Sequence, residues 1–355
     1  MFRLTTLSFL LLAFGSTSSA NPVEEGASAI GLLAKFRSWV QEHGKKYETQ
    51  AEELMRWKVW AANHERIEAH NNKEGVTFTL GHNEYSDMTE EEFAAYFKLG
   101  QHANVVQKDV TEARVAASER RTMFDDMTPL QLPDYVNWIQ LGGVVPVKNQ
   151  GACGSCWAFS TTGALEGAKF VRTGELVALS EQNLLDCDHK DLGCNGGLMD
   201  DAFKFDEKQG GLCSEEDYPY QARQGSECLT NCTDVPGSKV TSFVDVPEGS
   251  EMALLSAIAM QPISVAIQAN QFVFQFYKKG VITDDSCGSR GSIDHGVLAV
   301  GYGTDLETQE PYFLVKNSWG ATWGEDGYVK LGRNSKNQWG MCAILKMASF
   351  PLVDL

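Results

Sequence analysis

Two cysteines three positions apart, Cys153 and Cys156, are the residues whose types and spacing most directly suggest chemistry. They lie in the stretch QGACGSCWAF, residues 150–159, and Trp157 follows the second at once. Such a pair could be half of a zinc site, a redox pair or part of a structural disulfide, and one of its members could be a nucleophile at the start of a helix.

The zinc-site and redox-pair interpretations find little support elsewhere in the sequence. A structural zinc site needs a second pair of Cys or His ligands, and the sequence has no second C-x-x-C. A thioredoxin-like pair would lie in a βαβ unit, whereas this pair lies in a glycine-rich segment that leads into a predicted helix. The cysteines number nine, which is odd, so at least one thiol stays outside the disulfides. We therefore favour a nucleophile.

A nucleophilic cysteine needs partners that the second part of the sequence supplies. A helix N-terminus and a neighbouring imidazolium can lower a thiol pKa from about 8.5 to as low as ~3.5. The site also needs a histidine, a group that orients it and a donor to the oxyanion. After residue 150 the histidines are His189 and His295, and the segment IDHGVLAVGYG places His295 at the start of a predicted strand. The segment VKNSWG adds Asn317 and Trp319.

These three segments resemble the active-site blocks of papain-like cysteine proteases of the cathepsin L type. His295 lies 139 residues after Cys156, within the spacing typical of that family, and Asn317 lies 161 residues after it, slightly beyond. A longer loop at GTDLETQEPYF accounts for the excess. The resemblance implies an α+β fold with a helical left domain, an antiparallel β-barrel-like right domain and an N-terminal, mainly helical prodomain.

The resemblance also implies a role for each residue of the site. Cys156 would be the nucleophile and His295 its proton acceptor and donor. Asn317 would orient the imidazole, and Trp319 would shield that contact from water. Gln150 and the backbone N–H of Cys156 would form the oxyanion hole. The resemblance implies neither a metal nor a cofactor.

A substrate pocket follows from the same resemblance. Glycines would form an open S1 rim, and the S2 pocket would be apolar without an acid at its base. We therefore expect Leu, Val or Phe at P2 rather than Arg. Paired histidines in an insertion, as in dipeptidase-type relatives, are absent from the sequence, which favours an endopeptidase. The substrate-binding positions are Gly154, Gly196, Gly197, Leu198, Met199, Ala266, Ile293, Asp294 and Met347.

If Cys156 stays free, the other eight cysteines can form four disulfides. The resemblance implies the pairs Cys153–Cys194, Cys187–Cys228 and Cys287–Cys342, and Cys213 and Cys232 remain for each other. Whether Cys228 or Cys232 meets Cys187 stays open, because connectivity does not follow from sequence. The acceptor sequence Asn231-Cys232-Thr233 predicts a glycosylation site.

The region before the cysteines resembles an inhibitory propeptide. Six residues at spacings of three and four form one helix stripe, and it resembles the family's propeptide helix motif with Trp60 in place of phenylalanine. A second motif follows, with Tyr85 as another aromatic exchange. Acid would loosen this prodomain as carboxylates such as Asp87 are protonated. The stripe consists of Glu52, Arg56, Trp60, Asn63, Ile67 and Asn71, and the second motif of Gly81, Asn83, Tyr85 and Asp87.

The predicted organisation has three parts. Residues 1–20 have the cationic start, apolar stretch and small C-terminal residues of a secretory signal peptide. Residues 21–130 form the propeptide, with a helical core at about 30–99 and a linker at about 100–130. Residues 131–355 form the peptidase domain, whose helical half spans about 131–240 and whose strand-rich half spans about 241–355.

The amino-acid composition restricts the classes of molecule that this protein can bind. A net charge of −17 argues against nucleic acid or an anionic membrane surface. We expect protein and peptide substrates, the chain's own propeptide as inhibitor, cystatin-like inhibitors and a monomeric state. The expected location is the secretory pathway, ending in a lysosome or vacuole or outside the cell. Two alternatives remain: a catalytically silent relative that binds or stores, and a transglutaminase-like Cys-His acyltransferase.

Overall fold

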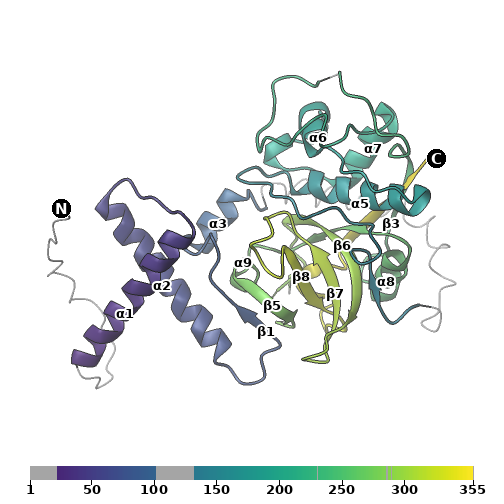
Figure 1. Cartoon of the computed structure of the whole chain (residues 1–355). Coiled ribbons are helices and arrows are strands. Elements are labelled where there is room, and N and C mark those ends of the chain that lie inside the picture. Colours follow the sequence, from purple (N-terminus) through teal and green to yellow (C-terminus); the bar gives the residue numbers. More distant parts are fainter. Residues whose placement is uncertain (1–21, 101–131, 230, 285–286, 289, 355) are drawn as a thin grey trace. The chain divides into compact units, whose positions relative to one another are not determined.

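The computed structural model describes residues 22–100 and 132–354, apart from residues 230, 285, 286 and 289 (Figure 1). The predicted signal peptide and nearly all of the predicted linker lie outside these residues. The chain forms two compact units, residues 1–61 and 62–355, and each is described by itself.

The first unit is held together by aromatic side chains. It contains α1 (Pro22–Glu42) and the first half of α2 (Gln50–Asn71). Phe36, Trp39 and Trp60 are its buried core. The Trp60 ring meets the Phe36 ring edge-on, with centroids 5.7 Å apart. The tryptophan at position 60 therefore fills a core position, as a large ring in the propeptide helix motif should.

The helical half of the peptidase region is built around α5. The sequence predicts a helix from about Ser155 to Arg172, and the observed bounds differ by one residue at each end. This helix ends at Gly174, which adopts a left-handed conformation with φ 75°. The sequence also predicts Ser180 as the N-cap of the next helix, and α6 begins directly after it, where the Ser180 side chain accepts a hydrogen bond from the Asn183 backbone N–H. The helices of this half are α5 (Cys156–Thr173), α6 (Glu181–Cys187), η3 (Gly193–Asn195) and α7 (Met199–Gln209).

The other half is one mixed sheet. Among the described residues its strands follow the order β1-β5-β8-β7-β6-β4-β9-β3, with β2 paired to β6. Neighbouring strands are antiparallel except β5 and β8, which are parallel. The strands are β1 (Phe78–Leu80), β2 (Val136–Asn137), β3 (Val240–Asp245), β4 (Ile263–Ile267), β5 (Tyr277–Ile282), β6 (His295–Thr304), β7 (Pro311–Lys316), β8 (Tyr328–Gly332) and β9 (Met347–Val353). Helices α8 (Glu251–Met260), α9 (Phe272–Gln275) and η4 (Met341–Ala343) complete this half.

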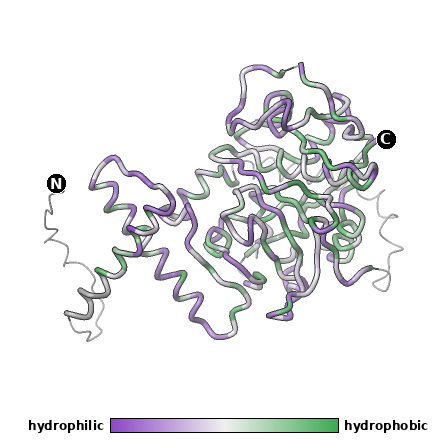
Figure 2. The backbone as a smooth tube through the Cα atoms, viewed as in Figure 1, coloured by the Kyte–Doolittle hydropathy of each residue, from purple (hydrophilic) through white to green (hydrophobic). Residues whose placement is uncertain are grey.

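The central strands are buried on both faces. Every residue of β4 is buried, as are all of β6 except its last residue. Helix α5 contacts β6, β4 and β9, and α8 also contacts β6. The sequence predicts short alternating strands here, such as PISVAIQA and GVLAVGYG. Instead both faces of these strands are buried, because protein covers each side of the sheet. Figure 2 colours the backbone by hydropathy, with hydrophobic segments in green.

The prodomain extends this sheet. Strand β1 pairs with β5 in an antiparallel ladder, and Asn83 Nδ2 donates to the backbone carbonyl of Gln275 at 2.7 Å. Thr89 and Glu92 predict a capping box for a short helix that runs through Phe97. Helix α3 (Glu90–Tyr96) begins with this box, in which the two residues bond reciprocally. Segments from the prodomain and the peptidase region therefore share one sheet within the second unit.

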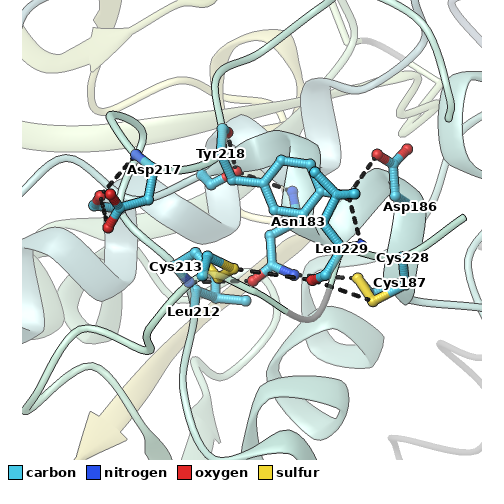
Figure 3. The surroundings of a disulfide bond; sticks show 12 residues. Asn183, Asp186, Cys187, Leu212, Cys213, Asp217, Tyr218, Cys228 and Leu229 are labelled. Carbon is cyan, nitrogen blue, oxygen red and sulfur yellow. Dashed lines mark hydrogen bonds between the residues drawn. A yellow bond between two sulfur atoms is a disulfide. The ribbon is translucent and has the colours of Figure 1, made fainter.

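Four disulfides join the eight cysteines other than Cys156, and their pairs are those that the sequence analysis names. Figure 3 shows the surroundings of the Cys187–Cys228 bridge, to which Asn183 and Tyr218 are neighbours. None of the helices in the described ranges is both long and apolar enough to cross a membrane. The pairs are Cys153–Cys194, Cys187–Cys228, Cys213–Cys232 and Cys287–Cys342.

Candidate active site

The β6–β7 pair brings a histidine and an asparagine together. His295 is the first residue of β6, and Asn317 follows the last residue of β7. These strands are antiparallel neighbours, so the start of one lies beside the end of the other. The His295 Nε2 atom lies 2.8 Å from Asn317 Oδ1. Because that oxygen can only accept, the neutral ring carries its proton on Nε2.

The other ring nitrogen, His295 Nδ1, is buried and has no hydrogen-bond partner among the described residues. Cys156 is the first residue of α5 and the one cysteine outside the disulfides. A Cβ placed on Gly296 would lie 3.3 Å from the Cys156 carbonyl oxygen, so the starts of α5 and β6 are in contact. Cys156 and His295 line the same pocket.

Burial in this covered cleft favours the neutral forms of both groups. It raises the pKa of the Cys156 thiol to about 11, although the backbone N–H groups of Gly296 and Trp157 favour the thiolate. It lowers the pKa of His295 to about 4, although the hydrogen bond that the ring donates to Asn317 favours the charged form. A thiol at a helix start beside an imidazole predicts a depressed thiol pKa. The direction is opposite here because both groups are desolvated in the proform, in which the prodomain residues Lys98 and Gly100 line the same pocket.

We expect the pH profile of thiol alkylation to change when the prodomain is removed. In the proform, iodoacetamide should react faster only as the pH approaches the raised pKa of Cys156. In the mature enzyme, water stabilises the charged pair, and the rate should reach a plateau in the acid range typical of histidine-paired thiols, about 3.5–7.5. At pH 6 the mature form should react at least ~100-fold faster, since lowering the thiol pKa by one unit raises the thiolate fraction about tenfold.

The shape of the profile separates ionisation from access. A steric block by the prodomain would scale the rate equally at every pH, whereas a change in pKa moves the inflection. Equal inflections in the two forms would contradict the effect of burial described above.

Gln150 is held at both ends of its side chain. It is fully buried. Its Nε2 donates to the Cys153 carbonyl oxygen at 2.8 Å, and its Oε1 accepts from Ser318 Oγ at 2.7 Å. A primary amide has two N–H groups, so one remains for another acceptor at the start of α5.

Trp319 covers the histidine. Its ring is fully buried and stacks on His295 with centroids 4.7 Å apart and an interplanar angle of 25°. Phe97 from the prodomain also stacks on Trp319, at 4.5 Å. The His295 ring is therefore covered on the face that stacks on Trp319, and the shielding role of Trp319 stays a prediction.

All nine predicted substrate positions line the pocket that also contains Cys156 and His295. A Cβ on Gly154 would lie 2.6 Å from the Cys194 carbonyl oxygen, so only glycine fits there. Burial raises the pKa of Asp294 to about 7, and its Oδ1 accepts from the Ala269 backbone N–H at 2.7 Å. The shared lining residues are Gly154, Gly196, Gly197, Leu198, Met199, Ala266, Ile293, Asp294 and Met347.

Two prodomain residues, Lys98 and Gly100, also line this pocket. Lys98 Nζ donates to Asn195 Oδ1 at 3.0 Å, and the Gly100 backbone N–H donates to the Asp294 carbonyl oxygen at 3.3 Å. Neither residue is among those that the sequence predicts for the site. Their position directly after Phe97, where the predicted helical core gives way to the linker, is the signal that points to them.

Comparisons with known proteins agree with this geometry. Residues 132–352 match the papain family cysteine protease domain, and residues 36–93 match the cathepsin propeptide inhibitor domain. Procathepsin L of Rattus norvegicus is 43% identical over 332 residues, covering 90% of this chain and 92% of the relative. A cysteine protease of Arabidopsis thaliana is 42% identical over 347 residues, covering 96% and 93%.

Solved structures of precursors are similar over most of the chain. A ragweed pollen cysteine protease in its proform superimposes with a TM-score of 0.78 at 34% identity, covering 92% of this chain and 95% of that one. A digestive procathepsin L of Tenebrio molitor gives a TM-score of 0.75 at 35% identity, covering 90% and 98%.

Proposed function

The chain belongs to the papain family of cysteine proteases, with its own inhibitory propeptide, and from this premise we propose how its residues hydrolyse peptide bonds. His295 Nδ1 takes the thiol proton as Cys156 Sγ attacks the scissile carbonyl carbon. The same imidazole returns a proton to the leaving amine, and an acyl-enzyme remains. Water, activated by His295, then hydrolyses the acyl-enzyme.

One observation carries this assignment. The free cysteine of the chain lies at the start of α5 in the same pocket as a histidine whose far nitrogen is bonded to Asn317. Asn317 holds the ring plane, and Trp319 keeps water away. Gln150 and the Cys156 backbone N–H supply the oxyanion hole. These features count against a silent binding or storage relative, because each group that the mechanism requires is present in one pocket or bonded to it.

The pocket supports an apolar P2 preference. Leu198, Met199, Ala266 and Met347 line it, and Asp294, with its raised pKa of about 7, is mostly protonated at lysosomal pH. An arginine at P2 would therefore bury its charge without a carboxylate partner.

We expect a Leu-Arg fluorogenic peptide to be cleaved with at least ~30-fold higher kcat/KM than an Arg-Arg peptide at pH 5, since an unpaired buried charge costs roughly 2 kcal/mol or more. Met347→Glu should narrow this ratio by pairing the P2 arginine, and Met347→Leu should leave it unchanged. Equal cleavage of both peptides by the wild type would exclude Met347 from the S2 pocket.

The propeptide supports an acid-activated zymogen. Lys98 and Gly100 line the pocket and bond to Asn195 and Asp294 at its edge, so we expect substrate to enter only after this segment leaves. Asp87 is buried in the prodomain, and its proposed part in acid release stays a prediction. The activity proposed for the mature form is that of an endopeptidase on protein and peptide substrates.

The compartment and partners follow from chemistry rather than geometry. Four disulfides fit an oxidising secretory route that ends in a lysosome, a vacuole or the extracellular space. Asn231 is exposed, which suits glycosylation. The net charge of −17 disfavours nucleic acid and anionic membranes as partners. We propose a monomer that cystatin-like inhibitors would block at the open cleft.

A further inference from the structure

The segment around Tyr220 reaches the catalytic residues from a distant part of the sequence. Its position is fixed by its backbone: the Tyr220 N–H donates to Glu215 Oε1 at 2.9 Å, and the Gln221 N–H donates to Gln182 Oε1 at 2.9 Å. The Tyr220 ring meets Phe159 of α5 edge-on, with centroids 4.8 Å apart. The hydroxyl is thereby directed at the start of α5.

This hydroxyl links two segments of the site. Tyr220 Oη donates to the Gln150 carbonyl oxygen at 2.8 Å. It also lies 2.6 Å from Ser155 Oγ. With the tyrosine proton directed to Gln150, the serine hydroxyl donates to Tyr220 Oη, and the two bonds form one chain that polarises along its length.

The Ser155 side chain does not make the hydrogen bond expected of a serine at the start of a helix. Ser155 is the N-cap residue of α5, yet it makes no side-chain capping bond to the helix. Serine at this position commonly accepts a hydrogen bond from the first helical turn. Here its hydroxyl bonds to Tyr220 instead, so the contact with Tyr220 fixes the residue immediately before Cys156.

We propose that Tyr220 is a positioning residue of the oxyanion hole, whose hydroxyl holds the Gln150 segment and the N-terminus of α5 at a fixed separation. This inference rests on the proposed roles of Gln150 and the Cys156 N–H. An oxyanion hole works because its donors are fixed before the charge develops. A tie between the two donor segments therefore matters in the transition state more than in substrate binding.

The tyrosine can serve as a constant donor. Burial raises its pKa above the ordinary value, and negative charge on Glu181 and Cys156 adds to the shift, while the bond with Ser155 opposes it. The hydroxyl stays protonated throughout the working range of the enzyme. Its hydrogen bond to Gln150 is thus independent of pH, unlike the protonation of the Cys156 thiol and the His295 imidazole.

The test is Tyr220→Phe in the full chain, matured by an added aspartic protease so that processing does not depend on the variant's own activity. We expect kcat for a fluorogenic peptide to fall about 3- to 10-fold, the effect of one neutral hydrogen bond. Ki for a peptide aldehyde should rise by the same factor. The aldehyde adds the Cys156 thiol across its C=O: the S–C bond forms, the oxygen enters the hole, and the thiol proton passes to that oxygen or to His295.

Alkylation by iodoacetamide gives the contrasting readout. This displacement of iodide at an sp³ carbon creates no oxyanion, so its rate and pH profile should stay within about twofold of the wild type. A parallel slowing of alkylation would mean that Tyr220 acts on the thiol and would overturn the proposal. An unchanged aldehyde Ki in an active enzyme would overturn it as well.

Tyr218→Phe is the matched control. It removes a hydroxyl from the same segment, one that donates to Asp186 Oδ2 at 2.8 Å and has no bond to the oxyanion hole (Figure 3). We expect a lower Tm with kcat and aldehyde Ki unchanged. An equal loss of kcat and aldehyde affinity in Tyr218→Phe would mean that the effect of Tyr220→Phe reflects only the stability of the loop.

Ser155→Ala is a second variant that tests the same hydrogen-bond chain, and it does so alone if Tyr220→Phe does not fold. It should also weaken aldehyde binding. With a folded Tyr220→Phe, the double variant should lose little more than the larger single loss, because both changes break one chain. Full additivity would contradict the chain. If the wild type itself neither cleaves peptide nor binds the aldehyde, the proposed function fails rather than this inference alone.

Discussion

Cys156→Ser should leave a chain that folds, keeps its prodomain and cleaves nothing. The serine hydroxyl has nearly the size of the thiol but a far higher pKa, so neutral His295 cannot generate the nucleophile. We expect peptidase activity to fall by ~10⁴-fold or more, the scale seen when a nucleophile is removed from a catalytic group that acts as a unit. The wild type and Cys156→Ser are both held at acid pH with a thiol reductant. Their intact mass and their cleavage of a Phe-Arg peptide are followed together.

The wild type alone should lose roughly a hundred residues and gain activity, with the new N-terminus in or near the predicted linker. Processing of the serine variant at the same rate would show that maturation depends on another protease. If both chains remain whole, and remain inactive after the prodomain is removed by an added protease, the silent binding-protein alternative would replace the proposed function.

Gln150→Ala should lower kcat by about 10²- to 10³-fold with a much smaller change in KM. The loss corresponds to one donor to an oxyanion in a buried site, on the order of 3 kcal/mol in the transition state. The amide is fixed by the Cys153 carbonyl and by Ser318, so its position is set before substrate arrives. The measurements are kcat and KM on one peptide and the Ki of a peptide aldehyde.

Gln261→Ala provides the comparison, because Gln261 is also a buried amide, and its Nε2 donates to the Pro351 carbonyl oxygen at 3.1 Å rather than into the cleft. It should lower Tm and leave kcat close to the wild type. If Gln150→Ala raises KM and leaves kcat unchanged, Gln150 belongs to substrate binding and not to the oxyanion hole.

Much of the fold could be predicted from local sequence. The capping box at Thr89 and Glu92, the N-cap at Ser180 and the end of α5 before Gly174 each depend on residues within a few positions of one another. The burial of β4 and β6 on both faces could not be predicted in this way. It depends on α5 and α8, and the packing of helices on a sheet is not encoded in the strand that they cover.

The sequence by itself determined the chemistry: a thiol at a helix start, a histidine opening a strand, an asparagine closing another, and enough cysteines to leave one free. Only the tertiary structure decided their ionisation in the zymogen, the prodomain residues Lys98 and Gly100 in the cleft and the contact of Tyr220 with Gln150 and Ser155. The physical reason is that residue types set which reactions are possible. Desolvation and hydrogen-bond geometry instead arise between segments that meet only when the chain has folded.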